Sequence, residues 1–221
     1  MILLFSGGLD SFIAYHYLRK PKTLYVDLGH RYAVHEVDMV KRLIPDTIID
    51  TRLNLADWEE KDANIPLRNA FLIMIASKYD DDVVLVVQRG EMNIPDRSVY
   101  FFNNFGEWLT YLWGDKRSIS TPFFHMTKTQ MVEWYLKMNL PKDALLSTRS
   151  CYSPGDLPCG ACAACFRRWV AFINNGLSEE YENDITKYSA IPQYIEKMKL
   201  RKYDRLRTEE TFTALRKVGI I

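Results

Sequence analysis

The fold is decided by residues 2–11, which read Ile-Leu-Leu-Phe-Ser-Gly-Gly-Leu-Asp-Ser. The first four residues form an apolar run with the length of a buried strand. Two glycines follow at once, and the segment 12–19 after them is helix-like. A strand that turns through glycines into a helix N-terminus presents backbone N–H groups to an anion. This stretch therefore predicts an α/β protein with a phosphate site at its first turn.

The polar side chains of this turn suit a nucleotide. Ser6 and Ser11 can donate hydroxyl hydrogen bonds to phosphate oxygens, and the backbone of Gly7 and Gly8 can come close to them. Asp10 would repel phosphate, so we expect it to hold a magnesium ion. The alternative is a plain strand–turn–helix corner with a serine cap. The whole hexapeptide, placed directly after a strand, favours the phosphate site.

The composition limits the partners of the chain. It has 221 residues, 48% of them hydrophobic, which is enough for a sizeable core. The formal net charge is +1, which gives no general reason to expect nucleic acid or membrane binding. The longest apolar run, 70–76, is too short to span a bilayer. No signal peptide fits the start, so we expect a cytoplasmic protein.

Strands and helices alternate along the first half of the chain. Further strands are predicted at 23–28, 47–49, 83–87 and 118–123. Helices are predicted at 34–43, 70–79, 107–113 and 128–138. This order predicts a parallel, doubly wound sheet with right-handed crossovers. The strand at 118–123 is expected at an edge because Pro122 cannot donate to a central ladder. In the helix 34–43, Val34 and Val40 are expected on one apolar face.

The carboxyl ends of parallel strands are where ligands bind in such sheets, so we expect the glycine turn and residues 27–32 to line one site. Arg68 and Asn69 begin a predicted helix and could face phosphate or adenine. The alternative is that Asn69 is an N-cap and Arg68 a solvated cation. Later, Thr127 and Gln130 predict a capping box. Lys128 then lies in the first helical turn, where a cation is unfavourable unless an anion is near.

All four cysteines lie between residues 151 and 165, with the spacing C-x7-C-x2-C-x2-C. Clustered cysteines in a chain without an export signal indicate a metal site rather than disulfides. Four thiolates suit a closed tetrahedral zinc site. The alternative is an iron–sulfur cluster, which the same spacing also allows.

We divide the chain into an α/β domain at 1–145, which carries the phosphate-binding turn, and a zinc-binding, helical C-terminal region at 146–221. The last segment, 173–221, is helical and rich in lysine and arginine. It could be a basic arm for nucleic acid, but interspersed acidic residues favour a solvated helical extension.

Five blocks of the sequence resemble, in the same order, the 7-cyano-7-deazaguanine synthase (QueC) family of PP-loop ATP pyrophosphatases. These blocks are 6–11, 27–32, 66–69, the segment from Thr121-Pro122 to Thr127-Lys128, and Ser150-Cys151-Tyr152 leading into the cysteines. They cover roughly residues 2–170. The hexapeptide is specific to the superfamily, whereas the cysteines after Ser-Cys-Tyr are specific to the family.

The resemblance implies a two-stage reaction with ATP and magnesium. The carboxylate of 7-carboxy-7-deazaguanine is adenylated, ammonia displaces AMP to give an amide, and a second ATP activates the amide oxygen so that loss of AMP leaves the nitrile. The zinc is structural, and a homodimer is implied. The product serves queuosine or another deazaguanine nucleobase modification, so neither nucleic acid nor membrane is an expected partner.

The resemblance also assigns residues. The implied ATP-binding residues are Ser6, Gly7, Gly8, Leu9, Asp10, Ser11 and Val26, with Val26 beside the adenine. The implied catalytic residues are Asp10, Arg68 and Lys128. The implied substrate-binding residues are Arg31, Asn69, Pro95, Asp96 and Arg97. The implied zinc ligands are Cys151, Cys159, Cys162 and Cys165.

One stretch departs from the family pattern. The family usually shows Gly-Tyr-Pro-Asp-Cys-Arg-Pro near the base pocket, and residues 93–99 read Asn-Ile-Pro-Asp-Arg-Ser-Val here. This leaves open a divergent member that stops at the amide or acts on another acid. Two other functions also stay open. One is a tRNA-thiolating PP-loop enzyme with an iron–sulfur cluster, which the near-neutral charge disfavours. The other is a partner protein that binds ATP without turning it over.

Overall fold

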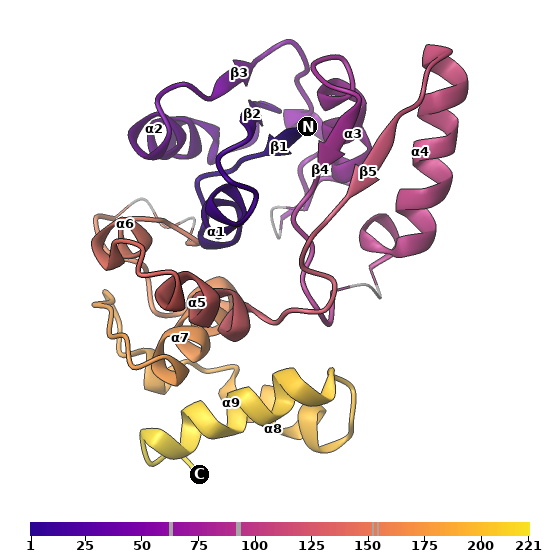
Figure 1. Ribbon diagram of the computed structural model, residues 1–221. Coiled ribbons are helices and arrows are strands. Elements are labelled where there is room, and N and C mark those ends of the chain that lie inside the picture. Colours follow the sequence, from indigo (N-terminus) through magenta and orange to yellow (C-terminus); the bar gives the residue numbers. More distant parts are fainter. Residues whose placement is uncertain (62–63, 92–93, 152, 154) are drawn as a thin grey trace. The chain divides into compact units, whose positions relative to one another are not determined.

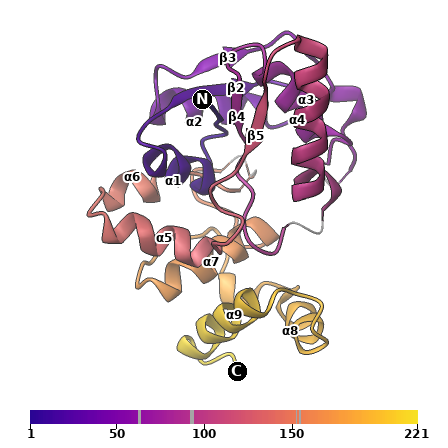
Figure 2. The ribbon, with the colours of Figure 1, turned by 45° about the vertical axis from the view of Figure 1, so that its right-hand side comes forward.

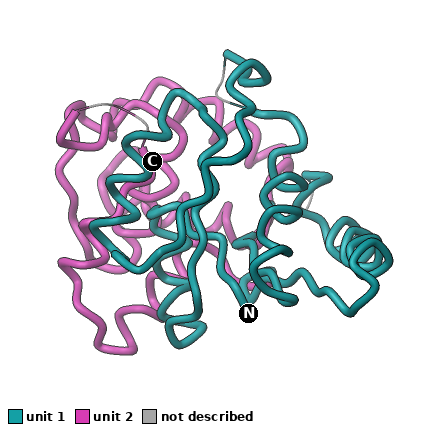
Figure 3. The backbone as a smooth tube through the Cα atoms, turned by 90° about the horizontal axis from the view of Figure 1, so that it is seen from above, with its two compact units in different colours: residues 1–87, 91–124 teal, residues 88–90, 125–221 magenta. Residues whose placement is uncertain are grey.

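The structure is a computed structural model that describes residues 1–61, 64–91, 94–151, 153 and 155–221. Asn93 and Tyr152, which belong to two of the motifs above, lie outside the described residues. Contacts within the chain group it into two compact units (Figure 3). Unit 1 comprises residues 1–87 and 91–124, and unit 2 comprises residues 88–90 and 125–221. The segment 125–145 thus groups with the cysteines in unit 2.

Unit 1 is built on one five-stranded parallel sheet. Its strands are β1 (Ile2–Leu4), β2 (Lys22–Val26), β3 (Ile48–Asp50), β4 (Asp82–Val84) and β5 (Ser118–Ser120). They run in the order β3-β2-β1-β4-β5. The predicted doubly wound α/β fold is confirmed, and β5 lies at an edge, two residues before Pro122.

Helices cover both faces of this sheet, α1 and α2 on one side and α3 and α4 on the other (Figure 1). The helices are α1 (Leu9–Tyr17), α2 (Ala33–Leu43), α3 (Arg68–Ala76) and α4 (Val99–Trp113), with 3-10 turns η1 (Ala56–Trp58) and η2 (Pro95–Arg97). On the α3 and α4 side, Ile73 and Leu109 pack on the strand residues Ile2, Leu24 and Val83. These side chains are fully or almost fully buried.

The strand order determines where a ligand can bind. The chain leaves β1 for β2 on one side, whereas β4 pairs with β1 on the other side. The carboxyl end of β1 is therefore a topological switch point, where neighbouring connections diverge and leave a crevice. The glycine turn at residues 7–8 follows β1 directly and lies at this point.

Two predicted helices differ from the observed ones. Helix α4 begins at Val99 rather than at residue 107, and the Ser98 hydroxyl caps it by accepting from Phe101 N at 3.0 Å. Its apolar residues lie all around the helix, so no single period reveals its first half. In α2 the buried residues include Ala33 and Val40, whereas Val34 is 72% exposed. Ala33 and Val40 are seven residues apart and share a face, and Val34 is rotated about 100° away.

Unit 2 is helical in the described residues. Its helices are α5 (Lys128–Lys137), α6 (Lys142–Leu146), α7 (Ala163–Asn174), α8 (Ile191–Lys199) and α9 (Arg205–Lys217), with a 3-10 turn η3 (Ile185–Lys187). Helix α7 is central and contacts both α5 and α9. The predicted capping box is confirmed, because Thr127 Oγ1 accepts from Gln130 N at 3.2 Å and Gln130 Oε1 accepts from Thr127 N at 3.0 Å. Among the described helices of either unit, none combines the length and apolarity needed to cross a bilayer.

A buried arginine holds the middle of unit 2 together. The Arg168 side chain is 1% exposed, and its guanidinium forms an ion pair with Glu179 at 2.8 Å. It also donates to Thr148 Oγ1 at 2.7 Å and to Leu146 O at 3.2 Å. These bonds tie α7 to the segment that leads into Cys151. Removing one partner of such a buried pair typically costs about 3–5 kcal/mol of folding free energy.

Candidate active site and metal centre

The turn after β1 has a backbone that only glycine fits. Gly7 adopts φ +71°, a left-handed conformation that other residues rarely take. A Cβ atom at this position would stand 2.8 Å from Met39 Cγ and 3.3 Å from Val40 N. The chain therefore passes close against α2 here before it enters α1.

Helix α1 begins at Leu9, so Ser11 is inside its first turn and not its cap. Gly8 is the N-cap residue, and no side chain caps the helix. The buried Ser11 hydroxyl donates to Gly8 O at 3.1 Å and lies 3.3 Å from Ser6 Oγ. Leu9 is 1% exposed, so its side chain belongs to the core and does not line the turn. The arrangement gathers backbone donors and two hydroxyls at a positive helix end, which suits an anion.

The carboxyl end of β2 lies beside β1 in the same sheet. Val26 is buried in β2, and the Asp27 carboxylate accepts from Gly29 N at 2.8 Å, which shapes the turn after the strand. Arg31 is bound to Glu59, with Nε 2.5 Å from Oε1, and it donates to Glu60 O at 2.8 Å. In this structure the Arg31 charge is therefore balanced by the protein's own carboxylate.

A polar cluster of Tyr25, His30 and Glu36 was not predicted from the sequence. The Glu36 carboxylate accepts from Tyr25 OH at 2.9 Å and lies 3.3 Å from His30 Nε2. His30 Nδ1 is buried and has no hydrogen-bond partner among the described residues. A histidine between apolar and charged residues carries no periodic signal, so its pairing with Glu36 could be found only in three dimensions.

Four of the substrate-binding candidates lie near one another in unit 1. Asn69 is buried, and its Nδ2 donates to Asp96 O at 3.4 Å. Arg97 forms an ion pair with Glu91 at 3.2 Å. Pro95, Asp96 and Arg97 make up η2, which contacts α3.

The alternative role of Asn69 as an N-cap is wrong. Leu67 occupies the N-cap position with φ 61°, an uncommon conformation for leucine. Arg68 is the first helical residue and is half-buried. The left-handed Leu67 turns the chain so that Asn69 points into the protein and not back along the helix end.

Lys128 belongs to unit 2, in the first turn of α5. The neighbouring Thr127 hydroxyl donates to the Glu210 carboxylate at 2.5 Å. Burial raises the pKa of Glu210, although its bonds to Thr127 and Thr129 oppose that rise. A carboxylate from α9 thus stands at the same helix N-terminus as Lys128.

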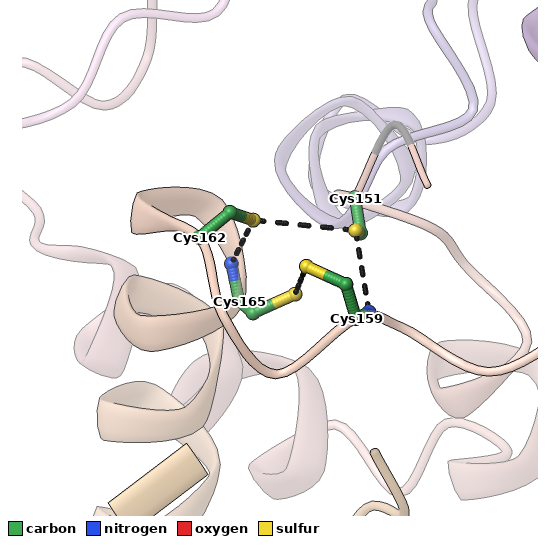
Figure 4. A group of neighbouring side chains, drawn as sticks. All are labelled: Cys151, Cys159, Cys162 and Cys165. Carbon is green, nitrogen blue, oxygen red and sulfur yellow. Dashed lines mark hydrogen bonds between the residues drawn. The ribbon is translucent and has the colours of Figure 1, made fainter. Parts of the chain in front are cut away.

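The four cysteines converge on one point (Figure 4). Their Sγ atoms all lie within 4.8 Å of one another. The Cys159 and Cys165 sulfurs are 3.8 Å apart, and those of Cys151 and Cys162 are 4.0 Å apart. A tetrahedron of zinc–sulfur bonds has edges of about 3.8 Å. The four residues are therefore poised to bind a single metal ion and match zinc. In a cubane cluster each cysteine binds a different iron, which would spread the sulfurs further apart.

Backbone N–H groups point at these sulfurs. Cys151 Sγ accepts from Ser153 N and Cys159 N, Cys159 Sγ accepts from Ala161 N, and Cys162 Sγ accepts from Cys165 N, each at 3.4 Å. Bonds from the Cys162 and Cys165 thiols hold the pKa of the Cys151 thiol well below its usual range, whereas burial raises the pKa of the Cys159 thiol to about 11. The pKa of the Cys165 thiol is also raised, chiefly by its bonds with Cys151 and Cys162. The backbone N–H bonds to the sulfurs are the contacts that favour thiolate, the form that binds metal.

Arg149 supports the loop between the first two cysteines. It donates through Nε to Cys151 O at 3.1 Å and through one terminal nitrogen to Gly155 O at 2.6 Å and to Ser153 O. One guanidinium therefore gathers three backbone carbonyls around the start of the metal site. No spacing rule in the sequence identified this role.

The fold and these sites define a doubly wound parallel α/β protein with a glycine turn after its first strand and four cysteines poised to bind a metal ion. Residues 22–176 match the family model described as queuosine biosynthesis protein QueC. Because this match covers well over half of the sequence, the chain belongs to the QueC family.

Curated relatives agree with the family match, and each of the following is named 7-cyano-7-deazaguanine synthase. The chain is 22% identical to the protein of Chlorobaculum parvum, over 88% of this chain and 99% of that protein. It is 26% identical to the Methanosarcina mazei protein, over 80% of this chain and 95% of that one. It is 30% identical to the Halobacterium salinarum protein, over 71% of each.

Proposed function

We propose that this protein is an ATP-dependent carbon–nitrogen ligase that converts 7-carboxy-7-deazaguanine and ammonia to 7-cyano-7-deazaguanine. The observation that carries the proposal is membership of the QueC family, whose curated members named above are synthases of this compound. The glycine turn at the switch point of the sheet supports the ATP dependence, because it offers donors to phosphate where nucleotides bind in such folds.

In the proposed reaction the substrate carboxylate attacks the α-phosphorus of ATP, and pyrophosphate leaves. Negative charge accumulates on the phosphates in that step and must be balanced. The N–H groups at the start of α1 and the hydroxyls of Ser6 and Ser11 would bind the phosphates. Asp10 would hold magnesium, whose charge would offset that of the pyrophosphate.

Arg68 and Lys128 are the proposed cations that stabilise the developing charge. Ammonia then displaces AMP from the acyl adenylate to give the amide, and a second ATP activates the amide oxygen so that AMP leaves with it and the nitrile forms. Val26 is proposed to bind the adenine through its backbone. The base is proposed to bind near Arg31, Asn69 and residues 95–97, where Asn69 already contacts the backbone of Asp96.

The zinc is proposed to be structural, because four cysteine ligands leave no open position for a substrate. By likeness to the family, we also propose that the protein acts in the cytoplasm as a homodimer, with nucleic acid and membranes absent from its partners.

The test is mass spectrometry of purified protein incubated with ATP, magnesium, ammonium and 7-carboxy-7-deazaguanine. We expect the nitrile, with two AMP released for each nitrile formed. Amide as the final product would identify a member that stops halfway, in keeping with the departure at residues 97–99. If the zinc-loaded, folded protein gave neither product nor AMP, the substrate assignment would be refuted.

A further inference from the structure

A histidine that follows β2 has one ring nitrogen beside a carboxylate and one without a partner. His30 Nε2 lies 3.3 Å from Glu36 Oε2, and the same carboxylate accepts from Tyr25 OH at 2.9 Å. The His30 and Glu36 side chains are 16% and 20% exposed. His30 Nδ1 is buried, and it has no hydrogen-bond partner in the part of the chain that the structure describes. None of these three residues binds ATP or the base in the proposed reaction.

The Glu36 carboxylate favours one tautomer of this ring. A neutral imidazole has one N–H donor and one acceptor lone pair. Because a carboxylate accepts hydrogen bonds, its place beside Nε2 favours the tautomer with the proton on Nε2. Nδ1 is then a buried acceptor, and a buried acceptor without a donor costs free energy. A small donor that reached Nδ1 would recover that free energy.

The cluster is continuous with both parts of the proposed site. His30 directly precedes Arg31, a proposed substrate-binding residue. Glu36 lies in the first turn of α2, three residues before Met39, which a Cβ at Gly7 would meet at 2.8 Å. Residues three apart share a face of a helix, so the face of α2 that meets the glycine turn also carries Glu36. Helix α2 lies on the same side of the sheet as α1, which that turn enters (Figures 1 and 2).

The charges around His30 favour a cation. Glu36 faces it from α2, and Glu59 approaches it from the segment after η1. Burial works to raise the pKa of Glu59, but its bonds with Arg31 and the charge of His30 lower that pKa overall. The two carboxylates outnumber the one guanidinium, so a positive charge at His30 is balanced by the protein.

The proposed reaction needs a proton acceptor for its nucleophile. Like the amine of lysine, ammonia is mainly protonated at neutral pH, and ammonium has no lone pair with which to attack. The proposed catalytic residues are a magnesium ligand and two cations, none of which is proposed to accept a proton. Ammonium is about the size of a water molecule and donates hydrogen bonds without accepting any, so it suits a buried acceptor among carboxylates.

We propose that His30 Nδ1 binds the ammonium ion and takes one proton from it, an inference that rests on the proposed function. An N–H bond of ammonium breaks, its electron pair stays on nitrogen, and the proton forms a bond to Nδ1. The ammonia then attacks the acyl carbon of the adenylate, AMP leaves with the electron pair of the C–O bond, and the amide nitrogen releases its extra proton to solvent. Glu36 is a positioning residue that balances the imidazolium charge, as carboxylates do beside catalytic histidines.

The first test separates ammonia transfer from adenylation. The products of His30→Gln are measured by mass spectrometry with ammonium or with hydroxylamine as the nucleophile. We expect amide formation from ammonium to fall by about 100-fold or more, the usual contribution of a general base. Hydroxylamine is uncharged at neutral pH, so hydroxamate formation should stay near the wild-type rate. His35→Gln changes an exposed histidine of α2 and should leave both rates unchanged.

Glu36→Gln should show the same selective loss, since an amide cannot balance the positive charge of the ring. Amide formation by His30→Gln at the wild-type rate would overturn the inference and leave the proposed function standing. An equal fall with both nucleophiles would also overturn it, because the histidine would then serve adenylation or folding. Wild-type protein that gives neither AMP nor hydroxamate would refute the proposed function, and this inference with it.

The second test needs no turnover. Long-range proton–nitrogen NMR spectra report which ring nitrogen of His30 carries the proton, and His30→Gln identifies its signals. We expect the proton on Nε2, and we expect the Nδ1 resonance to shift when ammonium chloride is added but not when sodium chloride is added. A proton on Nδ1, or the same response to both salts, would overturn the ammonium site whatever the acid substrate proves to be.

Discussion

Two turns of this chain lead into helices, and we assign their backbone N–H groups to different partners. At residues 5–11 the helix α1 begins after its N-cap Gly8 without a side-chain cap, and its first N–H groups are the proposed donors to ATP phosphates. At residues 159–165 the donors are taken up by the chain's own cysteine sulfurs, and Cys162 caps α7 by accepting from Cys165 N. The glycine turn is the proposed site for an anion from solution. The cysteine turn is poised to bind a cation through its sulfurs.

Because of this difference, substitutions in the two turns are expected to affect different properties of the protein. The cysteine turn is part of the folded core of unit 2, because Cys165 and Cys151 pack with Phe166, Trp169 and Ile185. The glycine turn is proposed to shape the ATP site. Changes in the cysteine turn are therefore expected to reduce stability, and changes in the glycine turn to reduce ATP turnover.

The largest effect is expected from Cys151→Ser. It replaces a buried thiolate ligand with a weak one, and structural zinc contributes on the order of 10 kcal/mol of binding free energy to folding. We expect bound zinc, measured by elemental analysis, to fall from one per chain to a small fraction, and the melting temperature to fall by more than about 10 °C. Ser153→Ala is the control, since it keeps the backbone N–H that binds Cys151. A variant with full zinc content and wild-type stability would contradict the four-cysteine site.

Gly7→Ala should have an intermediate effect. The added Cβ meets Met39 and the residue must keep φ +71°, which together cost about 1–3 kcal/mol of stability. Because the turn would shift to relieve this strain, we expect AMP release to fall at least about 10-fold while the zinc content is unchanged.

The matched control is Gly176→Ala. Gly176 has φ +69°, and a Cβ there would meet no atom within 4 Å. It therefore carries the same backbone penalty without the contact, and it belongs to unit 2, whereas the glycine turn belongs to unit 1. Equal loss of AMP release in the two variants would show that activity follows stability and not the shape of the turn.

The same two turns differ in how far the sequence alone could predict them. The glycines, the strand before them and the helix after them all lie within fifteen residues, so local rules located the turn and the parallel sheet around it. The start of α1 was misplaced by about three residues because Ser11 resembles a cap. The four cysteines could be assigned to a metal site, but the choice of a single ion over a cluster needed the distances between their sulfurs.

The supporting contacts could not be predicted because they join residues distant in sequence. Arg168 binds Glu179 in a loop after its own helix, and Asn69 binds Asp96 across 27 residues. Helix α4 was predicted only from residue 107, because its aromatic first half packs on the sheet without a simple period. Tertiary packing, and not local propensity, decides such elements.

The smallest effect, and the sharpest test of the cysteine turn, is expected from Arg149→Ala. The guanidinium binds no metal, but it gathers the carbonyls of Cys151, Ser153 and Gly155 and so orders the loop that carries the first ligand. Loss of a group that orients a metal ligand typically costs about 10–100-fold in metal affinity. We expect zinc release to a chromogenic chelator to be about 10-fold faster, with the zinc content of the purified protein unchanged.

Arg149→Lys should behave like the alanine variant, since an ammonium cannot replace the planar guanidinium. Arg167→Ala, which removes an exposed arginine of α7, should release zinc at the wild-type rate. Wild-type release from Arg149→Ala would mean that the N–H bonds to the sulfurs suffice to order this turn, and its contrast with the glycine turn would then lie in the backbone alone.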